Sequence, residues 1–366
     1  MGESVRVLAE QGHWDRVPAA IVGLMLLNSI VASVVAARRD WRQLGQVTVL
    51  TLPIFIAAAL IGLLRGVTPP STGFGWLAWP LALLWHVRLL HAQRRWLQPA
   101  LQRILHVAGL WFFLLMAARE CQSQLANVGD AYSAWPLLGW VLVPVIALWA
   151  LRSRLLLARW PLTDYRSLYL ECALQPVALL LLCWCWATNV LSAGDAAPLP
   201  FVPVLNPLEL VQWLVLTALV LWWKVLPASA DMRVPPHWAK AVTALTAWAL
   251  LTGAVLRACH HYADVAWNLN ALYVSTLTQA ALSIAWAMCG VLAMVLGNRR
   301  GTRIVWIAGV ALLGVVVLKL FFVELANQGS LFRIVSFIGV GTLLLLVGYF
   351  APVPTLRRTA PVEVPA

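Results

Sequence analysis

The stretch VPAAIVGLMLLNSIVASVVAA, residues 17–37, contains no charged residue and is followed directly by Arg38 and Arg39. An α-helix needs about 20 consecutive apolar residues to cross the hydrocarbon core of a bilayer. The stretch is also too long for the apolar region of an ordinary signal peptide. It therefore predicts a transmembrane helix near the beginning of the chain.

Further apolar stretches of this kind follow along the whole chain. They lie at residues 44–64, 74–90, 104–118, 135–151, 168–191, 207–226, 238–256, 275–296, 304–323 and 331–350. No alternation of apolar and polar residues persists, so a closed barrel of strands is not expected. We predict an all-α, polytopic transmembrane bundle of about eleven spans with no soluble domain. The third and fourth stretches are short, so they could form a tilted or re-entrant pair.

The overall composition agrees with this fold class. Of the 366 residues, 62% are hydrophobic and 11% are charged, whereas soluble chains carry about 25% charged residues. The net charge of +12 does not indicate nucleic-acid binding, because no basic run exceeds two consecutive residues. We therefore expect the lipid bilayer to surround the chain and expect no nucleic-acid partner.

Lysine and arginine residues gather in alternate connections between the stretches. Most of the 26 basic residues follow the odd-numbered stretches, and the others lie on the opposite side. These others are Arg6, Arg16, Arg65, Arg119, Arg257, Lys319 and Arg333. Positively charged connections stay in the cytoplasm. The pattern predicts a multi-pass protein of a bacterial inner membrane, with a periplasmic N-terminus and a cytoplasmic tail at residues 351–366.

The connection before the seventh stretch is rich in proline. It reads PLPFVPVLNP at residues 198–207 and holds four prolines, so it should be stiff and extended. Asn206 followed by Pro207 predicts a helix start, because Asn accepts hydrogen bonds from free N–H groups and Pro suits the first helical position. We expect the segment to lie against the outer membrane interface or over the helix bundle.

Two parts of the chain resemble recurrent elements of a known family. PLPFVPVLNPLEL at residues 198–210 and VLKLFFVELANQGSLFRIVSFIGVGTLLLLVGYF at residues 317–350 resemble a bacterial membrane-protein family catalogued as domain of unknown function 2339. The resemblance covers residues 198–350 and is faint over residues 1–197. Members are typically longer, so the chain looks like the C-terminal portion of one. The resemblance implies a helical membrane fold and brings no established activity with it.

Ionisable residues are concentrated at the predicted outer ends of the last spans. Arg257 ends the eighth span and precedes His260, Lys319 and Glu324 end the tenth, and Arg333 begins the eleventh. Such groups cost free energy near a membrane interior and often mark functional sites. We predict a periplasm-facing cavity in which Arg257, Lys319 and Arg333 bind an anionic group. Glu324 or His260, at the rim, would act as the base.

Simpler interpretations of these residues compete with a site. The Lys319 ammonium could extend along its flexible stem to the outer interface, and Glu324 could pair with Arg333. His260 and His261 diverge by about 100° on a helix, so they should not share one metal ion. The chain also lacks the H-E-x-x-H, Walker and dinucleotide-binding motifs. We therefore expect neither a metal nor a cofactor.

These observations predict a cell-envelope protein that handles an amphipathic or lipid-linked anionic molecule at the periplasmic face. Binding alone and group transfer both fit, so enzymatic activity is left open. A transporter or flippase is the first alternative, and it would need polar residues at mid-membrane depth on several helices. A non-catalytic scaffold of an envelope complex is the second alternative, and it would need no cluster of polar residues.

Overall fold

The computed structural model describes residues 14–67, 69–94, 96–129, 133–153, 158–227 and 233–320, together with Gly341 and Leu345. Within these ranges every regular element is a helix and no strand is present, so the predicted all-α fold is confirmed. The chain divides into two compact units, Met1–Leu250 and Leu251–Ala366, which we call unit 1 and unit 2. The boundary falls inside one helix, α11 (Pro236–Ala263).

Seven helices in the described ranges are long and apolar enough to cross a membrane. They are Trp14–Arg39, Arg42–Leu64, Pro99–Leu125, Leu168–Leu191, Pro207–Val225, Pro236–Ala263 and Thr276–Arg299. Trp135–Ala150 is apolar but shorter. The predicted count of about eleven spans is therefore not established. The stretch predicted at residues 331–350 lies outside the described residues, except for Gly341 and Leu345.

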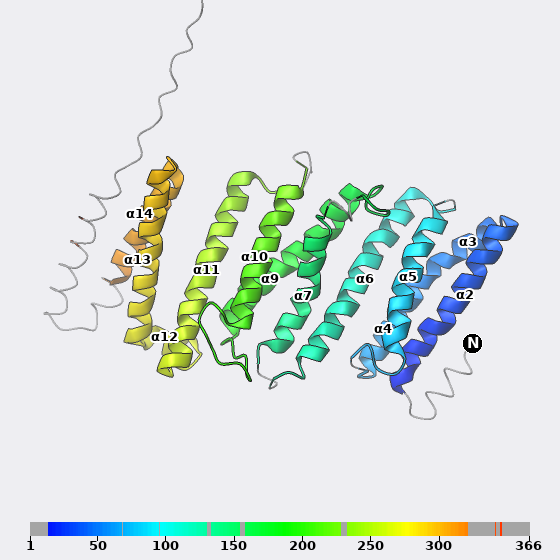
Figure 1. The fold of residues 1–366 in the computed structure, drawn as a ribbon, viewed down its shortest axis with the longest axis horizontal. Helices are drawn as coiled ribbons and strands as arrows, with labels where there is room; N and C mark the ends of the chain where they lie inside the picture. The colour runs from blue at the N-terminus through cyan, green and yellow to red at the C-terminus, as the bar shows by residue number, and fades with distance from the viewer. Residues whose placement is uncertain are drawn as a thin grey trace, which may run out of the picture. The chain divides into compact units, whose positions relative to one another are not determined.

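Unit 1 is built from helices that contact one another in pairs (Figure 1). In chain order they are η1 (Trp14–Arg16), α2 (Val17–Arg39), α3 (Arg42–Val47), η2 (Thr48–Leu50), α4 (Thr51–Leu64), α5 (Gly75–Gln93), α6 (Pro99–Leu125), α7 (Trp135–Ala150), the π-helical turn η3 (Leu168–Ala173), α9 (Leu174–Leu191) and α10 (Pro207–Val225). Helix α2 packs against α4 and α5, α6 packs against α7, and α7 packs against α9 and α10.

The two largest apolar cores of unit 1 lie in its two halves. Val22, Phe55 and Ala82 belong to the core of α2, α4, α5 and α6, while Val145 and Leu174 belong to the core of α7, α9 and α10. Large apolar side chains also cover the outside of the helices, among them Leu27, Leu64, Ile146, Leu180 and Leu191. Such exposed surface is unfavourable in water and favourable against lipid tails. The outward-facing residues therefore agree with a membrane protein.

Helix α6 is much longer than the fourth apolar stretch predicted. It has 27 residues, which gives it a length of about 40 Å and lets it span a bilayer without partial insertion. Polar residues extend it beyond residues 104–118, including Gln102 at one end and Arg119 and Glu120 at the other. The fourth stretch therefore forms a helix long enough to cross a membrane, because polar residues at both ends continue the helix, and the tilted or re-entrant arrangement stays a prediction.

Hydrogen bonds anchor the proline segment at the starts of α7 and α10. The Asn206 side chain accepts a hydrogen bond from the Leu208 backbone N–H at 2.9 Å, which confirms the predicted helix start. The same side chain donates to the Gly194 carbonyl oxygen at 2.7 Å. The Trp135 indole donates to the Ala197 carbonyl oxygen at 2.8 Å. These bonds tie the residues at both ends of the segment to the starts of α7 and α10, and its position against the membrane interface or over the bundle stays a prediction.

Unit 2 contains the last part of α11 followed by α12 (Leu269–Val274), α13 (Thr276–Arg299) and α14 (Arg303–Lys319). Helices α13 and α14 form a closely packed hairpin. Gly290 and Gly309 allow this approach, because a Cβ atom on Gly309 would lie 2.6 Å from the Gly290 carbonyl oxygen. Small residues commonly permit such close helix packing in membranes.

Candidate functional site

Lys319, the last residue of α14, points its ammonium at α13. Its Nζ donates to the Gln279 carbonyl oxygen and to the Ser283 hydroxyl, both at 2.7 Å. Gln279 and Ser283 lie four residues apart, so they share one face of α13. The Ser283 hydroxyl also donates to the Gln279 carbonyl oxygen at 3.0 Å. The ammonium therefore binds the neighbouring helix instead of extending along its own helix to water.

Arg257 on α11 is completely buried, with 0% of its surface exposed. Its guanidinium carbon lies 5.9 Å from the centre of the Trp267 ring, within the range of a cation–π contact. A buried arginine in a membrane helix is costly unless protein groups or water surround it. The structure thus places one predicted cation inside unit 2 and away from lipid.

His260 lies one turn beyond Arg257 and faces the same tryptophan. Its Nδ1 lies 2.6 Å from the Val265 carbonyl oxygen, and its ring centre lies 6.0 Å from that of Trp267. A carbonyl oxygen can only accept, so Nδ1 carries the hydrogen and Nε2 is the acceptor in the neutral ring. His260 and Arg257 therefore both lie beside the Trp267 ring.

Helix geometry places Arg257 and the partners of Lys319 at the same level of unit 2. The Trp286 indole donates to the Thr252 hydroxyl at 3.0 Å, which joins α11 to α13. Arg257 lies five residues after Thr252 on α11, which is about 7 Å from this contact in the direction of α12, because each helical residue adds 1.5 Å. Ser283 is about 5 Å along α13 in the same direction. Both cations therefore sit near the predicted outer end of unit 2.

Two predicted members of the site, Glu324 and Arg333, lie outside the described residues. The structure instead adds polar residues that the sequence reasoning missed, namely Gln279, Ser283 and Thr278. The Thr278 hydroxyl is buried and has no hydrogen-bond partner among the residues that the structure describes. A spacing of four residues between Ser275, Gln279 and Ser283 was the available signal, because it aligns polar groups on one helix face.

The site offers charged hydrogen-bond donors next to one potential base. Arginine and lysine donate strongly to carboxylate and phosphate oxygens, and the His260 Nε2 can accept a proton. The part of the chain that the structure describes contains no group of three His, Cys, Asp or Glu residues placed to hold a metal ion. Its residues suit binding of an anion, with His260 placed to assist a proton transfer.

A second buried polar cluster lies in unit 1. The His106 Nδ1 lies 2.8 Å from the Tyr169 hydroxyl, and its ring centre lies 4.2 Å from that of Tyr165. His86 and His106 are both buried, and the Nε2 atoms of both lack a hydrogen-bond partner within the described ranges. Tyr169 belongs to the π-helical turn η3, an irregularity that frequently accompanies functional sites. These residues are far apart in sequence, so no motif revealed them.

Comparison with known proteins gives one match. The model of a family described as predicted membrane protein (DUF2339) matches residues 5–354. The match covers nearly the whole chain and therefore extends well beyond the resemblance found at residues 198–350. No curated protein and no solved structure matches the chain.

Proposed function

The chain belongs to the DUF2339 family of predicted membrane proteins, and we propose that it binds an amphipathic or lipid-linked anionic molecule at the periplasmic face of a bacterial inner membrane. One observation carries the proposal. Arg257 is fully buried in unit 2, and Lys319 is directed into α13 at the same level. One cation is thus fully buried in unit 2, and the other is hydrogen-bonded to a neighbouring helix.

The energetic cost of these cations supports a functional role. Insertion scales assign about 2.5–3.5 kcal/mol to Arg or Lys at the centre of a membrane helix, and less toward its ends. Apolar residues would pack α13 against its neighbours without this cost. An anionic head group that binds between the cations would recover it through charged hydrogen bonds. Arg333 would add a third cation, and His260 or Glu324 would be the base if the protein also transfers a group.

The proposal is tested by measuring lipid binding to the full chain in bilayer nanodiscs. Native mass spectrometry would compare retained phosphatidylglycerol with retained phosphatidylethanolamine for the wild type and Lys319→Met. We expect wild type to prefer the anionic lipid. In Lys319→Met the ratio of retained anionic to zwitterionic lipid should fall at least about tenfold, which corresponds to 1.4 kcal/mol. Lys224→Met, in α10, is the matched control and should bind like wild type. Equal preference in wild type and Lys319→Met would reject the proposal.

A transporter or flippase is a second candidate, favoured by buried polar groups inside unit 1. The Ser29 hydroxyl lies 2.9 Å from the Thr51 hydroxyl and accepts a hydrogen bond from the Trp85 indole at 2.8 Å. Together with His86 and His106, these groups lie on several helices, as a transport route would require. Vesicles containing the protein and a fluorescent anionic lipid would test this by dithionite quenching. Complete quenching would support lipid movement between leaflets, and quenching limited to the outer leaflet would oppose it.

A further inference from the structure

Unit 1 contains an apolar cavity at one end of its first helices. The cavity has a volume of about 180 Å³ and lies between α2, α4, α5 and α6. Its walls include Pro18, Ala59, Gly62, Trp79 and Phe112. An apolar cavity of about 150 Å³ accepts a molecule the size of benzene. This cavity therefore has room for a segment of a hydrocarbon chain.

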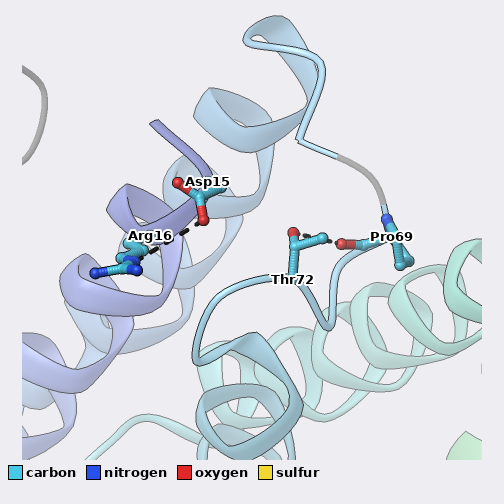
Figure 2. Close-up of polar contacts among 4 residues, drawn as sticks. All are labelled: Asp15, Arg16, Pro69 and Thr72. Atoms are coloured by element: carbon cyan, nitrogen blue, oxygen red, sulfur yellow. Dashed lines mark hydrogen bonds and ion pairs between the residues drawn. The ribbon is translucent and has the colours of Figure 1, made fainter. Parts of the chain in front are cut away.

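The mouth of the cavity is polar. Asp15 and Thr72 line it together with Arg119, and Figure 2 shows Asp15 in η1, just before α2, with its carboxylate directed toward Arg16. The loop that carries Thr72 can approach this helix start because Gly73 has a positive φ of 62° and no side chain, and a Cβ atom there would lie 3.1 Å from the Asp15 carbonyl oxygen. The backbone of the loop thus forms one edge of the opening.

Arg119 is the charged group at the mouth that the surrounding residues leave available. It is half-buried, and it makes no ion pair or hydrogen bond with any residue in the described ranges. The neighbouring acids already have partners. Both Glu120 carboxylate oxygens accept hydrogen bonds from Ser71, at 2.9 and 2.8 Å. Asp15 lies 4.0 Å from the Arg16 Nε (Figure 2). The mouth therefore offers a positive charge to a ligand.

The sides of the cavity are open to the surroundings of the helices. Leu60 and Leu63 on α4 and Leu115 on α6 line the cavity and are about half exposed. In a membrane these side chains face lipid, so a hydrocarbon chain can enter from the side. The distribution of basic residues assigns this end of the helices to the periplasmic side. A ligand would therefore come from the outer leaflet.

We propose that this cavity is a binding site for a single-chain anionic amphiphile, whose hydrocarbon chain fills the cavity and whose head group contacts Arg119. Apolar walls provide the affinity for the chain, because burying each methylene away from water is favourable. The arginine provides the selectivity for an anionic head group. The site belongs to unit 1 and is separate from the Lys319 site, so each proposal can fail without the other.

Photo-crosslinking tests this site in the full chain reconstituted in nanodiscs of zwitterionic lipid. The probes are an alkyl phosphate and an alkyl alcohol of equal length, each with a diazirine near the chain end. In wild type we expect the alkyl phosphate to label peptides from α4 and α6. Ala59→Phe should reduce this labelling at least tenfold, because the ring fills the cavity. Ala57→Phe is the matched control, since Ala57 is exposed on the same helix and does not line the cavity.

A second variant separates the head group from the chain and does not alter the apolar walls. Arg119→Gln should lower labelling by the alkyl phosphate about tenfold and leave labelling by the alkyl alcohol unchanged. Inorganic phosphate should not compete in wild type, because it lacks the chain. Labelling of Ala59→Phe at the level of Ala57→Phe would overturn the cavity as the chain site. Unchanged phosphate-probe labelling of Arg119→Gln, or full competition by inorganic phosphate, would overturn the proposed ligand. Lys319→Met should label like wild type, which keeps the two sites distinguishable.

Discussion

Replacing Lys319 by methionine should remove anion binding without a matching loss of stability. The substitution deletes two hydrogen bonds of 2.7 Å, to the Gln279 carbonyl oxygen and the Ser283 hydroxyl. In membranes, hydrogen bonds between helices contribute about 0.6 kcal/mol each on average and at most about 1.7. The loss is therefore about 1.2 kcal/mol on the average value.

The same substitution also removes an energetic cost. A lysine at the helix centre is unfavourable by about 2.5–3.5 kcal/mol, and this penalty falls toward the helix end where Lys319 lies. Methionine is apolar, flexible and similar in length, so it can pack in the same space. The two effects have opposite signs and similar size. We expect the free energy of unfolding to change by less than about 1 kcal/mol.

Ser283→Ala is the informative comparison. It keeps the ammonium and removes one of its acceptors, so the charge stays while its stabilisation falls. This should destabilise the protein by about 1 kcal/mol or more, because the charged ammonium then loses one of its two hydrogen bonds to α13. Unfolding of the full chain in bicelles, followed by steric trapping, measures both variants. A loss of more than about 3 kcal/mol in Lys319→Met would refute the reasoning and show that Lys319 is structural.

Three further predictions concern helix packing, capping and topology. Gly309→Ala should destabilise unit 2 by about 1–3 kcal/mol in the same unfolding assay, because the added Cβ would lie 2.6 Å from a backbone oxygen of α13. Gly314→Ala is the control and should not destabilise it, because nothing lies within 4 Å of the added Cβ. Equal stabilities of the two variants would contradict the close packing. Asn206→Ala should destabilise the protein by about 0.5–2 kcal/mol by removing the cap of α10. Protease cleavage of the proline segment is a second readout. Resistance to cleavage equal to that of the wild type would count against the anchoring role of Asn206. Reporter fusions after Arg166 and Ala193 should report cytoplasm and periplasm, and the same side for both would show an error in the topology.

The sequence alone determined the fold class because its causes are local. Consecutive apolar residues such as 17–37 are enough to predict a helix that can cross a membrane, and the charges in the flanking connections predict its orientation. The start of α10 was equally local, since Asn206 and Pro207 act on the first turn that follows them. Chain order also predicts that Arg257 and Lys319 lie at one level, because both lie near predicted helix ends.

Only the tertiary structure decided which residues meet, because contacts between membrane helices depend on how the helices are rotated and packed. Lys319 binds Ser283 and Gln279 from 36 and 40 residues away, and no local pattern requires it to turn inward instead of outward. His106 reaches Tyr169 from a helix whose partner was not predictable from spacing. In soluble proteins apolar residues mark the buried face of a helix, but in a membrane both faces are apolar, so the sequence carries little information about which face packs. The cavity lined by Ala59 and Arg119 is the clearest case, since it arises only where four helices pack together.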